Sequence, residues 1–173
     1  MNRVLMVFIT FFTLISCNQK VESKRYDEKG KLIIYNEEEY FKLVMLKGKK
    51  ISFTIVDTFC TNQRARAVKD IKNGKLVFYG FYPREYKKMS KILSKYGIEM
   101  KEQSQSDLTF GGFRPYCYED KMYEEICSKY GNRFIDSIFK VAQKEYVIEN
   151  PEDEYIEDGI DLRKKYLNKK NSH

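Results

Sequence analysis

The pair Asn73-Gly74 restricts the folding of this chain more than any other local feature. Both central residues of a type I′ turn need positive φ angles, which Asn and Gly tolerate better than other residues. The segments on either side, RARAVKDIK at 64–72 and KLVFYGFY at 75–82, are then two strands joined by this turn. The sequence therefore predicts a tight β-hairpin at Asn73-Gly74.

The remaining elements follow from hydrophobic periodicity and from capping residues. Asn36 followed by Glu39 resembles a capping box, and it predicts a helix that ends at Gly48. Further strands and helices are expected at 51–59 (strand), 86–96 (helix), 98–103 (strand) and on either side of Gly131-Asn132 (a helix pair). This order predicts an α+β fold with a small antiparallel sheet covered by about four helices.

The N-terminus carries an uncharged run of twelve residues, 4–15, directly after Arg3. A helix needs about 20 apolar residues to cross the ~30 Å core of a bilayer, so this run is too short to span it. Its length is typical of the hydrophobic region of a signal peptide. We therefore expect a targeting segment and not part of the fold.

The residues that end this run, Leu14-Ile15-Ser16-Cys17, match all four positions of a lipobox, and residues 1–17 resemble the signal peptide of bacterial lipoproteins. The resemblance implies cleavage before Cys17 and attachment of a diacylglycerol, with palmitate-type chains, to its sulfur through a thioether, which would anchor the protein to a membrane. Asn18 takes the place of the Asp that retains such proteins in the inner membrane of Gram-negative bacteria. In such an organism, the outer membrane is therefore the expected location.

Four regions are expected along the chain. Residues 1–16 form the signal peptide, and residues 17–30 form the lipidated cysteine with a polar, flexible tether. With 42% hydrophobic residues, the chain fits a single α+β domain at 31–150. A charged C-terminal tail follows at 151–173, with one short helix near Leu162.

Charge and histidine content argue against several classes of function. The formal net charge is +7, but clusters of acidic residues interrupt the basic ones, so no nucleic-acid partner is expected. The single histidine, His173, is the last residue. Its position disfavours triad hydrolases and zinc enzymes.

The acidic residues around Gly159 do not match a calcium-binding loop, because Ile156 falls where an oxygen ligand is needed. We therefore expect no metal and no other cofactor.

Three cysteines follow Cys17, and none of them forms a C-x-x-C pair. In an oxidising envelope two of them could form a disulfide, although spacing alone does not determine which two. Cys60, at a strand end, and Cys117, in a loop rich in Gly and Pro, are the favoured pair. Cys127 falls on the apolar face of a predicted helix, where we expect a buried thiol.

The loop FGGFRPYCY at 110–118 is the candidate binding surface. Its two glycines allow a ligand to approach the backbone closely, and Arg114 offers a planar, bidentate donor. Phe113, Tyr116 and Tyr118 could stack on a peptide or a sugar. The alternative is that Phe113 and Tyr116 only hold the loop against the sheet, and we favour this because aromatic side chains are more often buried than bound to a ligand.

These observations predict an envelope lipoprotein that acts as a non-enzymatic binding module for a protein, a peptide or a glycan. One alternative is an immunity or inhibitor lipoprotein that protects against an envelope-acting toxin. The other is a carboxylate-based hydrolase, which would need Asp57 and either Glu85 or Glu119 to converge in one cleft.

Replacement of Cys17 by Ser tests the predicted anchor. Because serine lacks the thiol that accepts the lipid, we expect Cys17→Ser to leave the precursor uncut or to release it from the membrane fraction. Fractionation with mass spectrometry of the N-terminus measures both effects. An unchanged membrane fraction, or a native protein that begins at Met1 without a fatty acid, would contradict the prediction.

Overall fold

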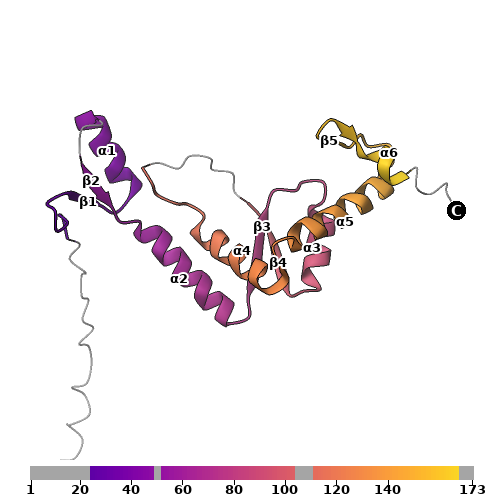
Figure 1. The fold of residues 1–173 in the computed structure, drawn as a ribbon, viewed down its shortest axis with the longest axis horizontal. Coiled ribbons are helices and arrows are strands. Elements are labelled where there is room, and N and C mark those ends of the chain that lie inside the picture. Colours follow the sequence, from indigo (N-terminus) through magenta and orange to yellow (C-terminus); the bar gives the residue numbers. More distant parts are fainter. Residues whose placement is uncertain (1–23, 49–51, 104–110, 168–173) are drawn as a thin grey trace, which may run out of the picture.

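The computed structural model describes residues 24–48, 52–103 and 111–167, so Cys17 and the lipobox lie outside the described residues. The described part combines six helices with three two-stranded sheets (Figure 1). The helices are α1 (Glu37–Lys47), α2 (Thr58–Lys72), α3 (Tyr86–Ser94), α4 (Cys117–Tyr130), α5 (Phe134–Glu149) and α6 (Leu162–Leu167). The strands are β1 (Leu32–Ile34), β2 (Phe53–Ile55), β3 (Leu76–Gly80), β4 (Ile98–Glu102), β5 (Ile156–Glu157) and β6 (Ile160–Asp161).

The N-terminal strands β1 and β2 are parallel, and α1 connects them. The predicted cap of α1 is confirmed, because the Asn36 side chain accepts a hydrogen bond from the Glu39 amide at 2.8 Å. Strand β1 was not expected from the sequence, because three residues are too few to show an alternating pattern.

Part of the predicted tether is held against these strands. The Asp27 carboxylate accepts hydrogen bonds from the backbone amides of Lys29 and Lys31 and from the Thr54 hydroxyl of β2. These hydrogen bonds lower the pKa of Asp27 below its ordinary value, and the bond from Thr54 has the largest effect. Residues 24–30 therefore form a turn beside β1 instead of a free linker.

The hairpin predicted at Asn73-Gly74 is wrong. Residues 58–72 form helix α2, and the pair ends this helix: the amides of Gly74 and Lys75 donate to the carbonyls of Ile71 and Asp70. This is a Schellman arrangement, which needs positive φ only at the glycine. Gly74 has a φ of 78°, whereas Asn73 has a φ of −85°, which excludes a type I′ turn.

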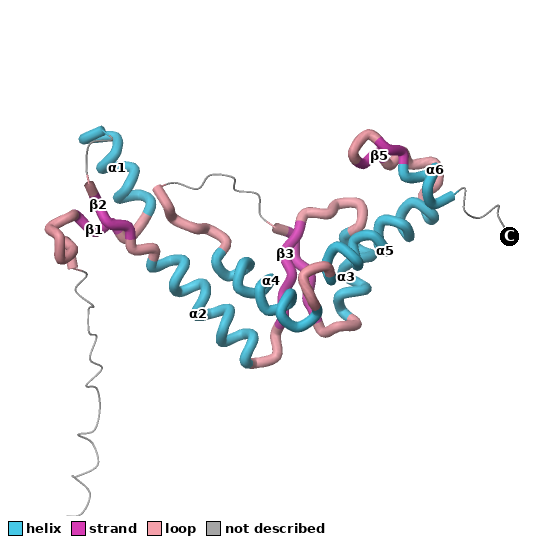
Figure 2. Tube along the Cα trace, in the orientation of Figure 1, coloured by secondary structure: helices cyan, strands magenta, loops and turns pink. Residues whose placement is uncertain are grey.

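The predicted antiparallel sheet is also wrong, although the mixture of helices and short strands is confirmed. Strand β3 pairs with β4 in parallel, in a register that runs from Leu76 opposite Ile98 to Gly80 opposite Glu102. Parallel neighbours require a crossover connection, and α3 supplies it. The strand expected at 64–72 would have been the antiparallel partner of β3, so its replacement by a helix removed that pairing. Figure 2 shows the two parallel strand pairs in different parts of the molecule.

The main core lies where α3, α4 and α5 pack around β3 and β4. Its buried members are Leu76, Phe78, Met89, Leu93, Ile98, Met100, Ile126, Ile135, Ile138 and Ala142. The helix pair predicted on either side of Gly131 is confirmed as α4 and α5. Within the described residues, no helix has the length and apolar character required to cross a membrane.

The charged C-terminal segment is anchored to α5. The helix expected near Leu162 is present as α6, and Leu162 is buried against Val147 and Tyr155. The Tyr155 hydroxyl donates a hydrogen bond to the buried carboxylate of Glu85. The pKa of Tyr155 is raised, mainly by burial and secondly by this bond. Strands β5 and β6 form a tight hairpin around Asp158-Gly159, where both φ angles are positive.

Substitutions at Asn73 and Gly74 distinguish the helix end from a hairpin turn. We expect Gly74→Ala to lower the free energy of unfolding by about 1 kcal/mol, because a Cβ disfavours the positive φ angle. Asn73→Ala is the matched control and should change it by less than about 0.5 kcal/mol. Urea unfolding of both variants measures the difference, and comparable losses at the two positions would instead indicate a type I′ turn.

Candidate functional site

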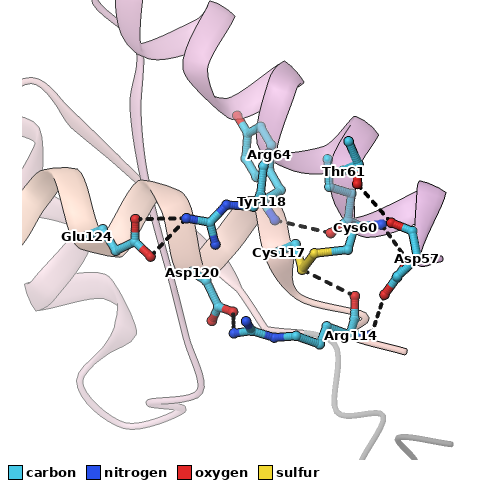
Figure 3. The surroundings of a disulfide bond; sticks show 10 residues. Asp57, Cys60, Thr61, Arg64, Arg114, Cys117, Tyr118, Asp120 and Glu124 are labelled. Carbon is cyan, nitrogen blue, oxygen red and sulfur yellow. Dashed lines mark hydrogen bonds and ion pairs between the residues drawn. A yellow bond between two sulfur atoms is a disulfide. The ribbon is translucent and has the colours of Figure 1, made fainter. Parts of the chain in front are cut away.

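The loop that the sequence singled out is joined covalently to helix α2. The Sγ atoms of Cys60 and Cys117, which are 57 positions apart in the sequence, form a disulfide with the two Cα atoms 5.2 Å apart (Figure 3). Cys60 lies in the first turn of α2, and Cys117 is the first residue of α4. The disulfide therefore holds the beginnings of the two helices together. Cys127, the third cysteine, is a free and only half-buried thiol.

Asp57 adds a polar connection beside the disulfide (Figure 3). Its Oδ1 caps α2 by accepting from the Cys60 amide at 2.8 Å, and its Oδ2 accepts from the Arg114 amide at 2.7 Å. Asp57 is half-buried, and its two backbone hydrogen bonds restrain both partners, because breaking either bond loses its contribution to stability. One side chain thus fixes both the helix start and the loop.

The Arg114 side chain extends from the loop toward the solvent. Its Nη2 lies 2.7 Å from Oδ2 of Asp120 in the first turn of α4, and 62% of the side chain is exposed (Figure 3). An exposed ion pair contributes little to stability. A guanidinium has five N–H donors and this pair engages one terminal nitrogen, so Arg114 can also donate to a ligand.

The three aromatic residues predicted in this loop have different surroundings. Phe113 is buried, and its ring meets the ring of Tyr40 edge-on, with the two ring centres 6.4 Å apart. Tyr118 is also buried, and its hydroxyl donates to Asp70 at 2.8 Å. The pKa of Tyr118 is raised, mainly by burial and secondly by the hydrogen bond to Asp70. Tyr116 is half-buried at the N-cap of α4.

Gly111 permits the packing of this loop on α1. A Cβ at this position would lie 2.6 Å from Cε2 of Tyr40, and its φ of 62° further disfavours any other residue. The glycine therefore serves the contact with Tyr40 and not, as the sequence suggested, the approach of a ligand.

A pocket of about 350 Å³ lies where the loop meets α2 and the start of α1. We call it the loop pocket, and it is lined by Tyr35, Asn36, Glu37, Asp57, Thr58, Phe59, Phe113, Arg114 and Pro115. Of the four residues predicted to bind a ligand, Phe113 and Arg114 line this pocket, whereas Tyr116 and Tyr118 do not. Its volume lies in the range of small-molecule or side-chain binding sites.

Sequence reasoning did not identify Tyr35 and Phe59 as members of this site. Phe59 is 60% exposed in the first turn of α2, and Tyr35 donates to the backbone carbonyl of Lys24. The segment of Phe59 was expected to be a strand with alternating burial, which concealed its exposure. The signal in the sequence would have been Asp57 as a helix cap, with an aromatic residue two positions later.

The carboxylates proposed for a hydrolase have separate surroundings. Asp57 binds the loop and the start of α2, whereas Glu85 is buried against Tyr155 near the C-terminal segment. Glu119 lines a different cavity from Asp57. Their contacts give no support to a catalytic pair.

Comparison with known proteins does not assign this chain to a family. Neither protein-family models, nor curated proteins, nor solved structures gave a match to this chain.

Removal of the disulfide tests its role in holding the site. Closing a loop of this length restricts the unfolded chain, so we expect Cys60→Ala/Cys117→Ala to lower the free energy of unfolding by about 2–4 kcal/mol. Cys127→Ala, which leaves the disulfide intact, is the control and should cost clearly less. Alkylation without reductant provides a second measurement. If Cys60 and Cys117 are both modified in the native protein, the bond is absent.

Proposed function

We propose that this chain is a lipid-anchored envelope protein that binds an apolar peptide segment of a partner protein in the loop pocket. The pocket's largely apolar lining carries the proposal. Ligand sites of this kind combine an apolar surface with a few polar groups that fix orientation. Here Phe113 and Phe59 supply apolar surface, and Arg114 supplies a donor at the rim.

The exposed ring of Phe59 supports a protein or peptide ligand more than a glycan. An aromatic side chain that is 60% exposed beside a pocket offers apolar area that a partner can bury. Aromatic and arginine residues also dominate the binding energy of protein interfaces. No catalytic group is required for this activity.

The position of the pocket relative to the predicted anchor supports a partner at the membrane. Tyr35 lines the pocket and donates to the carbonyl of Lys24 at 2.8 Å. Lys24 follows Cys17 by seven residues, which can extend over at most about 25 Å. If Cys17 carries lipid, the pocket is held close to the bilayer surface, within reach of other envelope proteins.

The disulfide supports the envelope as the compartment. Disulfides persist mainly in oxidising compartments, and the reducing cytosol rarely contains structural ones. The Cys60–Cys117 bond and the lipobox are independent features of the chain, and each supports the proposed extracytoplasmic location.

Panning of a random peptide library against the full-length protein in nonionic detergent tests the proposal. We expect selected peptides to lose at least about tenfold in affinity for Phe59→Ala and for Arg114→Ala, because each variant removes a contact at the pocket. Val141→Ala is the control, because Val141 is exposed on α5 and does not line the pocket.

Two outcomes would contradict this function. One is the absence of any enriched peptide. The other is a set of peptides that bind Phe59→Ala and Arg114→Ala as tightly as the unchanged protein. Circular dichroism separates lost binding from lost folding, and an unfolded Arg114→Ala variant would assign a structural role to Arg114.

A further inference from the structure

A second cavity, of about 480 Å³, lies at the carboxyl ends of the parallel strands β3 and β4. We call it the strand-end cavity, and it is lined by Phe78, Tyr79, Gly80, Phe81, Tyr82, Gln103, Glu119, Asp120, Tyr123, Ile135 and Asp136. Gly80 ends β3, and its carbonyl accepts from the amide of Gln103, which follows β4. In open parallel sheets, ligands bind beyond this edge, where the chain leaves the strands.

The charged side chains that line this cavity are all acidic. The lining contains the carboxylates of Glu119, Asp120 and Asp136 and no lysine or arginine. Asp120 is already paired with Arg114 at 2.7 Å. Asp136 is exposed at the start of α5. The cavity therefore favours a positively charged ligand.

Glu119 provides the independent sign of a ligand. Its Oε2 is buried, and no hydrogen-bond partner for it exists among the residues that the structure describes. Buried polar atoms in native proteins nearly always have a partner, because an unsatisfied one is costly. Because Glu119 lines the cavity, a cation bound there would pair with this carboxylate.

Aromatic rings form much of the remaining wall. Phe78 stacks on Tyr82 with ring centres 6.3 Å apart and lies 6.4 Å from the ring of Tyr123. A Cβ on Gly80 would lie 2.5 Å from Cε2 of Tyr82, so only glycine allows this ring to lie against the strand end. The faces of such rings attract ammonium and guanidinium groups.

We propose that the strand-end cavity binds an organic cation, an amine or a guanidinium with a short apolar body. The charged group pairs with the carboxylate of Glu119, and the apolar body lies against the tyrosine rings. A metal ion fits these residues less well, because no three His, Cys, Asp or Glu side chains within residues 24–48, 52–103 and 111–167 could hold one together. This site shares no lining residue with the loop pocket.

Titration of the full-length protein in nonionic detergent with n-butylguanidinium tests the proposal, with neutral n-butylurea as the matched probe. Tyrosine fluorescence and calorimetry report binding. We expect saturable binding of the cation only, and a loss of at least about tenfold in affinity for Glu119→Gln, which removes the charge from the hydrogen bond. Glu125→Gln, on the same helix but outside the cavity lining, should bind as the unchanged protein does.

Additional variants keep the test decisive. If Glu119→Gln does not fold, Asp136→Asn, at an exposed position of the same cavity, should still weaken binding of the cation. Phe59→Ala should leave it unchanged, which separates this site from the loop pocket. The proposal is overturned if the neutral probe binds equally well, if no saturable binding occurs, if both carboxylate variants bind normally, or if Mg²⁺ alone produces the same Glu119-dependent signal.

Discussion

The disulfide between Cys60 and Cys117 joins the first turn of α2 to the first residue of α4, across 57 residues of sequence. Asp57 strengthens this junction, because it caps α2 and binds the loop backbone at Arg114. Helix α4 then packs along both α2 and β3 (Figure 1). Both cavities depend on this junction: the loop pocket lies beside it, and α4 carries Glu119 from it to the strand-end cavity.

The two cavities differ in chemistry because they are formed by different kinds of segment. The loop pocket lies between a loop and the starts of two helices, where Phe59 and Phe113 supply apolar surface. The strand-end cavity lies at the edge of a parallel strand pair, where carboxylates from α4 and α5 meet aromatic residues of β3. One small fold thus offers an apolar site and a cation-attracting site that separate variants can test independently.

Features that depend on neighbours within about five residues were predictable from the sequence. The cap at Asn36 and Glu39, the helix pair around Gly131 and the strand at 98–102 were all identified, because the residues that form each of them are adjacent. Asn73-Gly74 marks where predictability ends. A hairpin turn and a helix end both use a positive φ angle at glycine, and only the packing of α2 against α4 decided between them.

The candidate site shows the same division. By itself, the sequence determined that histidine-based chemistry is disfavoured, that a loop rich in glycine and aromatic residues leads up to Cys117, and that Cys60 and Cys117 are the favoured pair of cysteines. The tertiary structure alone decided that β1 pairs with β2, and β3 with β4, in parallel. It also decided that Tyr118 is buried while Phe59 is exposed, and that one oxygen of Glu119 has no hydrogen-bond partner among the described residues. The physical reason is that strand direction and burial depend on contacts between segments far apart in the chain, whereas composition and capping residues act locally.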